Sequence, residues 1–145
     1  MQMEELFVEA ILWSLGYGSS EKYQRILNSL WEKSEDENEP ILLELEARHY
    51  EEAMAYLRSI MPEHFDSINE DFFGKCLMNR LQILYKELNI KTFGSVAYGI
   101  WGTFPESIKY KQPFFTLNYA DDLLFATHDE AGCRKLYESA FSYYD

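Results

Sequence analysis

The sequence is short of basic residues, with 13 Lys and Arg against 25 Asp and Glu, and its net charge at pH 7 is −12. Proteins that bind nucleic acid or anionic membranes need an excess of positive charge, so this shortage argues against both kinds of partner. Cysteine is also scarce, because Cys76 and Cys133 are the only two and they form no CxxC pair or disulfide framework. These absences predict a reduced, cytoplasmic protein.

Long apolar runs and catalytic signatures are missing as well. The run from Leu6 to Leu15 is interrupted by Glu9 and is too short to span a bilayer. The first five residues carry no positive charge, so we expect no signal peptide. No stretch matches a nucleophile signature or a phosphate loop, and the sequence predicts neither a cofactor nor a metal.

The negative charge is concentrated in one part of the chain. Residues 1–31 carry a net charge of −2, residues 32–71 carry −10, and residues 72–145 carry none. A field of one sign attracts partners of the opposite sign, so the position of the charge indicates where a basic partner would bind.

The hydrophobic pattern predicts a single α+β domain over residues 1–145. Up to about residue 88, apolar side chains recur at helical spacing and predict a bundle of about four helices. From residue 89 the chain is rich in Gly, Phe, Tyr, Val and Ile, a composition typical of strands and tight turns. We therefore expect a small antiparallel sheet, followed by a terminal helix, with strands over Lys91–Tyr98, Phe114–Tyr119 and Leu123–Ala126.

Acidic side chains crowd one expected loop and the helix that follows it. Like charges at this density repel one another, and a basic partner would relieve that repulsion. A solvated surface without a partner is the alternative interpretation of the same pattern. On the first interpretation, the partner-binding residues of this stretch are Glu35, Asp36, Glu37, Glu39, Glu44, Glu51 and Glu52.

The segment Tyr119-Ala120-Asp121-Asp122 is similar to the Tyr-x-Asp-Asp turn of reverse transcriptases. In those enzymes, paired aspartates on a strand–turn–strand hold two metal ions, because Mg²⁺ prefers oxygen ligands. The further aspartate and the nucleotide-binding segment that a polymerase needs are missing upstream. Three interpretations stay open for Asp121 and Asp122: an acidic turn, a second partner-binding patch, or the centre of a metal-dependent or nucleotide-handling enzyme.

In size, charge and aromatic content, the chain resembles bacterial immunity proteins of the contact-dependent and polymorphic toxin systems. Its tail carries part of the likeness, in the form Tyr119-x-Asp121-Asp122 … Asp129-Glu130 … Arg134 … Tyr137 … Phe141-x-Tyr143-Tyr144. The resemblance implies a binding protein rather than an enzyme, one that covers the active site of a basic toxin domain, often a nuclease. Toxin contacts vary within that class, so the resemblance assigns no binding residue by position.

Overall fold

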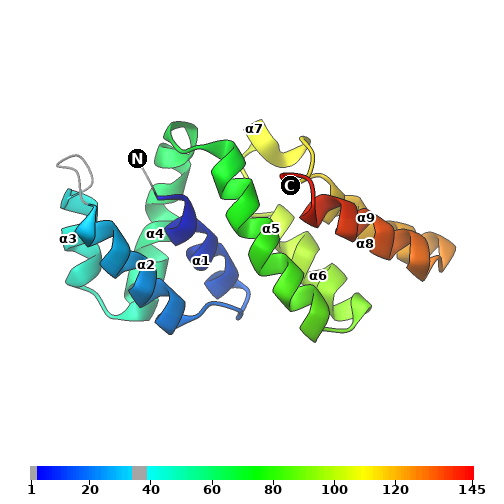
Figure 1. Ribbon diagram of the computed structural model, residues 1–145, viewed down its shortest axis with the longest axis horizontal. Helices are drawn as coiled ribbons and strands as arrows, with labels where there is room; N and C mark the ends of the chain where they lie inside the picture. The colour runs from blue at the N-terminus through cyan, green and yellow to red at the C-terminus, as the bar shows by residue number, and fades with distance from the viewer. Residues whose placement is uncertain (1–2, 34–38) are drawn as a thin grey trace. The chain divides into compact units, whose positions relative to one another are not determined.

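Every regular element that the computed structural model describes, over residues 3–33 and 39–145, is a helix (Figure 1). The chain forms two compact units, Met1–Phe73 (unit 1) and Gly74–Asp145 (unit 2), and the boundary falls inside one helix. The expected single domain stays a prediction, since a division into units does not test whether the two fold together.

Unit 1 is built around its first helix. In chain order, its elements are α1 (Glu4–Ser14), α2 (Ser20–Glu32), α3 (Glu39–Glu46), α4 (Tyr50–His64), a 3-10 turn (Phe65–Ser67) and the start of α5 (Glu70–Glu87). Helix α1 packs against both α4 and α2, and its side chains Leu6, Phe7 and Ile11 are inaccessible to solvent. Burial on nearly all sides explains why α1 is apolar almost throughout.

The spacing of apolar residues predicts one helix from Pro40 to Ile60, with His49 on its apolar stripe and Pro62 as its end, but the structure divides this stretch into α3 and α4. Its break falls at residues 47–49, where His49, expected on the apolar stripe of one helix, has an extended backbone with φ −69° and ψ 161°. Neither glycine nor proline marks this break, and Pro62, expected to end the helix, lies inside α4. The sequence offers Ser19 or Ser20 as the cap of α2, and the structure has Ser19 there, because its hydroxyl oxygen accepts a hydrogen bond from the Lys22 N–H at 3.2 Å.

Two buried carboxylates of α1 hold the starts of other helices in unit 1. Oε1 of Glu9 accepts a hydrogen bond from the backbone N–H of Ser19 at 3.2 Å, and Oε1 of Glu4 accepts one from the N–H of Asn69 at 2.9 Å. Ser19 and Asn69 are the residues that precede α2 and α5. Hydrogen bonds to charged acceptors are stronger than hydrogen bonds between neutral groups. The two acids therefore stabilise the packing of the N-termini of α2 and α5 against α1.

The expected C-terminal sheet is wrong, because the three expected strands lie in two helices. Helix α6 (Ile90–Trp101) contains Lys91–Tyr98, and α8 (Thr116–Thr127) contains Leu123–Ala126 and most of Phe114–Tyr119. The residues of this region do suit strands, but strand propensity depends strongly on what the side chains pack against. Here α6 and α8 bury their apolar faces against each other, and the helical arrangement prevails.

The sequence around α6 does contain helix signals. Its buried residues Ile90, Phe93, Ala97 and Ile100 are three or four positions apart, which is the spacing of one helix face. Asn89 caps the helix, since its Oδ1 accepts a hydrogen bond from the Thr92 N–H at 2.9 Å. The glycines inside this stretch are typical of turns and favoured the prediction of strands, but the helical spacing of the buried residues is the signal that the structure bears out.

In unit 2, α8 packs against both α6 and α9 (Glu130–Phe141), and a short helix, α7 (Glu106–Lys109), lies between α6 and α8 in the chain. Four aromatic rings of this unit, those of Tyr85, Phe93, Tyr137 and Phe141, form a cluster. The ring centroid of Phe93 is 5.3 Å from that of Tyr85 and 4.9 Å from that of Tyr137, and Tyr85 is 5.2 Å from Phe141. These edge-on contacts are the favoured geometry for aromatic pairs.

The expected terminal helix is confirmed, but its cap is not Thr127, which the pattern Thr127-x-x-Glu130 would predict. Thr127 is the last residue of α8, and His128 follows in the left-handed conformation with φ 56°. Asp129 caps α9, because its Oδ1 accepts a hydrogen bond from the Gly132 N–H at 2.9 Å. Two residues therefore separate the helices, the left-handed His128 and the cap Asp129.

Candidate functional site

The net negative charge of the chain belongs to unit 1. Residues Met1–Phe73 include 17 acidic and 5 basic residues, whereas Gly74–Asp145 includes 8 of each. The boundary between the units lies two residues after the boundary at which the sequence changes from acidic to neutral. Because both units are helical and similar in length, a helical fold does not by itself require the imbalance.

Part of the expected partner-binding set lies outside the described residues. Glu35, Asp36 and Glu37 belong to this part. Glu39 is the first residue of α3, and the structure describes its backbone but not its side chain. These four acids remain in the candidate site by their place in the sequence alone.

The other expected acids of unit 1 are exposed on two helices that contact each other, α3 and α4. Glu44 is in α3 and forms an ion pair with Arg48 at 2.9 Å. Glu51 and Glu52 occupy the first turn of α4, where negative charge interacts favourably with the helix macrodipole. Each of the three thus has a local structural role, and each also presents its charge to solvent.

One further acid on these helices, Glu46, was not among the expected site residues. Burial, followed by the charge of Glu46, raises the pKa of the Tyr23 phenol to about 12. Burial and the charge of Glu51 likewise raise the pKa of Tyr50, whose ring centroid is 5.7 Å from that of Tyr23. Burial first, and the neighbouring acids second, therefore favour the neutral form of the buried Tyr23 and the half-buried Tyr50.

Asp121 and Asp122 lie in the interior of α8 and form no turn. Adjacent residues of a helix point about 100° apart, so the two carboxylates cannot face one metal site as they would on a strand–turn–strand. Asp121 is half-buried and lies against α6, since a Cβ added at Gly94 would be 2.7 Å from its Cγ. Asp122 is exposed. The resemblance to the reverse-transcriptase turn therefore does not extend to its geometry.

Asp121 also influences α9 of the same unit. Burial, followed by the charge of Asp121, raises the pKa of the Cys133 thiol. Burial also raises the pKa of Tyr137, with smaller contributions from Cys133 and Asp121. A thiol that burial and a nearby carboxylate keep protonated is a poor nucleophile, so these contacts describe a packed core rather than a reactive centre.

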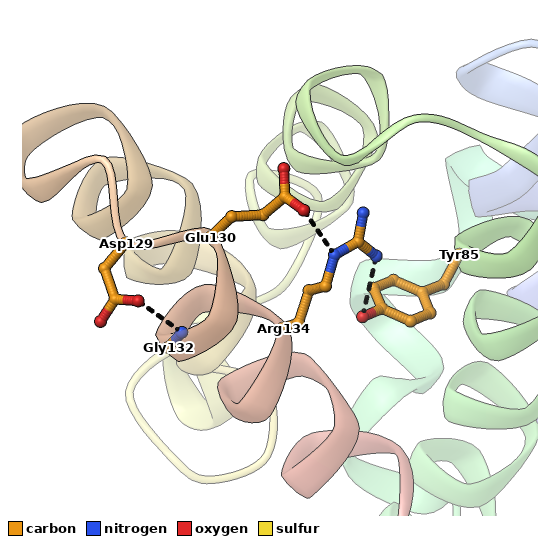
Figure 2. Close-up of polar contacts among 5 residues, drawn as sticks. All are labelled: Tyr85, Asp129, Glu130, Gly132 and Arg134. Carbon is orange, nitrogen blue, oxygen red and sulfur yellow. Dashed lines mark hydrogen bonds and ion pairs between the residues drawn. The ribbon is translucent and has the colours of Figure 1, made fainter.

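Figure 2 shows a polar network of unit 2 in which Arg134 lies between Glu130 and Tyr85. Its Nε donates to Oε2 of Glu130 at 3.1 Å, and its Nη1 donates to the Tyr85 hydroxyl at 3.2 Å. The bond to Tyr85, followed by the bond to Glu130, raises the pKa of the guanidinium. The network joins α9 to α5, and we assign it a structural role.

The structure thus places Glu44, Glu51 and Glu52 on two contacting helices of unit 1, whereas Asp121 and Asp122 lie in unit 2. Over residues 3–33 and 39–145, no group of three or more His, Cys, Asp and Glu side chains could hold a metal ion. None of the helices described in the chain combines the length and the apolar character needed to cross a membrane.

Comparison of the chain with protein-family models, curated proteins and solved structures finds no match. The resemblance to immunity proteins therefore stays a prediction.

Proposed function

We propose that the protein is an acidic binding protein that neutralises a basic partner, and that it serves in the cytoplasm as an immunity protein against a bacterial toxin domain. The observation that carries the proposal is the segregation of charge, with a net charge of −12 in unit 1 and none in unit 2.

The two units allow an internal comparison of the cost of that charge. Like charges held on one compact unit repel one another and destabilise it. Unit 2 shows that this chain can build a helical unit of about the same length with equal numbers of acidic and basic residues. Folding therefore does not require the excess of acidic residues in unit 1. A basic partner would explain this excess, because its Lys and Arg side chains would offset the repulsion among the acids.

The proposed mechanism is electrostatic capture followed by steric cover. Opposite fields steer two proteins together and raise association rates by about 10 to 10³-fold at low salt. Exposed acids such as Glu44, Glu51 and Glu52 would then pair with basic side chains around the functional cleft of the toxin domain. A phosphate-rich partner would be repelled by the same field.

The test begins with the tagged protein as bait in an extract of its native organism. The captured partner is then expressed and purified, and its association with the chain is measured by stopped flow at several salt concentrations. We expect a basic partner whose association is fast at low salt and slows steeply as salt rises. The triple charge reversal Glu44→Lys, Glu51→Lys and Glu52→Lys should slow association at low salt by about tenfold or more.

The matched control reverses three exposed acids of unit 2, Glu87, Glu106 and Glu138, and so changes the net charge of the chain equally. Glu106 is a suitable counterpart of Glu44, because each forms an ion pair with a base three or four residues further along the chain. We expect the control to slow association much less than the reversal in unit 1. Equal slowing by both, or a captured partner without excess positive charge, would refute the proposal.

A further inference from the structure

A cavity of about 860 Å³ opens in unit 1 beside the starts of α1 and α5. Part of its wall is apolar and consists of Ile26 and Leu30 from α2, Ile68, and Phe72 from α5. The side chain of Phe72 is 42% exposed, so it offers apolar surface at the cavity. The volume lies within the usual range of ligand sites.

Glu4, whose side chain is buried, is also among the residues that line this cavity. Glu4 is 2% exposed, and its Oε1 accepts the hydrogen bond from the Asn69 N–H. Its Oε2 is buried and has no hydrogen-bond partner in the described part of the chain. A buried carboxylate oxygen without a donor is costly, because burial removes the water that would otherwise bind it.

The bases on the α2 side of the cavity do not supply the missing donor. Arg25 is exposed and pairs with Glu21, at 4.0 Å. Lys33 is exposed as well, so solvent and salt screen both charges. The charge of Glu4 is shielded from solvent and is therefore the dominant uncompensated charge of this cavity.

We propose that the cavity binds one basic side chain of the protein partner, with the aliphatic stem on the apolar wall and the cationic head group on Glu4. Lysine and arginine suit such a site because each has an apolar stem and a charged end with several hydrogen-bond donors. The inference rests on the proposed function and deepens it, since it names the group of the basic partner that enters unit 1.

The test uses n-butylammonium and n-butylguanidinium as probes, with butyrate as the anionic control and 1-butanol as the neutral one. Binding to the intact chain is followed by NMR through the backbone amide signals of Asn69 and Ser67. We expect saturable shifts at millimolar concentrations of both cations and none with the two controls. Glu4→Gln should weaken cation binding by at least tenfold, whereas Glu5→Gln on the same wall should change it by less than threefold.

Glu4→Gln keeps the fold testable, because the amide oxygen of the replacement still accepts the hydrogen bond from Asn69. If that variant nevertheless unfolds, binding of the four probes to the unsubstituted chain tests the inference. Equal binding of butanol and butylammonium then overturns it. Unchanged cation binding by folded Glu4→Gln, or preferential binding of butyrate to the α2 bases, overturns it too.

The test of this cavity and the charge reversals that test the proposed function can fail independently of each other. With a purified partner, Glu4→Gln should leave the association rate within about twofold and speed dissociation at least fivefold, because one buried contact affects residence more than steering. If the reversals slow association but neither probe binds, this inference alone fails. If the probes bind at Glu4 but the reversals have no effect, the proposed function fails and the cation site stands.

Discussion

Gly94→Ala tests the close packing of α6 against α8 and the structural role of Asp121. Gly94 is buried in α6, and a Cβ placed there would contact Oδ1 of Asp121, with Cγ at 2.7 Å and Cβ at 3.0 Å. The Asp121 Cβ is bonded directly to the backbone of α8, so it cannot rotate out of the way. The added methyl group would therefore push the two helices apart or force Asp121 from its position.

Two opposing terms set the expected magnitude. Overpacking a buried site costs about 1–3 kcal/mol, and the contact with the Asp121 Cβ places this substitution in the upper part of that range. Replacing glycine by alanine inside a helix gains about 1 kcal/mol from helix propensity. We expect the free energy of unfolding to fall by about 1–2 kcal/mol.

The assay is urea unfolding at 25 °C, followed by circular dichroism and by tryptophan fluorescence, because a chain with two units requires a check for two-state behaviour. Gly102→Ala is the matched control. Gly102 follows α6 with a helical φ of −61°, and the nearest atom to an added Cβ is the Gly99 carbonyl oxygen at 3.4 Å.

The two glycine substitutions should therefore differ in sign. We expect Gly102→Ala to leave stability unchanged or to raise it by up to about 1 kcal/mol, because alanine restricts the unfolded chain. In an Asp121→Ala background, the cost of Gly94→Ala should shrink, since the contacts with Oδ1 and Cγ are gone. If Gly94→Ala is as stable as the unsubstituted chain, the proposed packing of Asp121 on α6 is wrong.

Three further substitutions test individual elements. Asp129→Ala removes the cap of α9 and should lower the free energy of unfolding by about 1 kcal/mol. Asp129→Asn keeps a capping oxygen and should retain most of that stability. Equal losses of stability in the two variants would contradict the capping role. His128→Gly relieves a left-handed residue and should raise stability by about 1 kcal/mol in the same urea assay. Tyr23→Phe tests the raised pKa of about 12. Between the unfolded pKa of about 10 and this value, the folded state binds more protons than the unfolded state, so stability falls as pH rises through that window. Tyr23→Phe should make this fall less steep, while Tyr110→Phe, at an exposed tyrosine, should not; identical pH profiles for the unsubstituted chain and Tyr23→Phe would refute the assignment.

Part of the candidate site could be predicted from the sequence. The concentration of acid before residue 72 is a property of composition, and the division into units agrees with it. Glu44, Glu51 and Glu52 were expected at the surface and are exposed. Glu4 could not be recognised, because its partner Asn69 is 65 residues away in the chain and an acid in a first helical turn has an ordinary explanation.

The fold was predictable only where local signals agreed. Ser19 followed by an amphipathic stretch specifies α2, because capping and a helical period act within a few residues. In α6 and α8 the local signals disagreed, since aromatic and β-branched residues suit strands while the spacing of the buried residues suits a helix. The expected sheet came from giving the first signal more weight.

The sequence by itself determined the charge of each unit and the helices whose caps and apolar periods coincide, because these depend on residues close together in the chain. Tertiary structure alone decided that residues 90–101 and 116–127 form helices, since each buries its apolar face against the other. It also decided that Asp121 lies against Gly94 and that Glu4 borders a cavity with one oxygen unpaired among the described residues. Burial and hydrogen bonding between distant residues set these features, and no local pattern specifies which distant residues will meet.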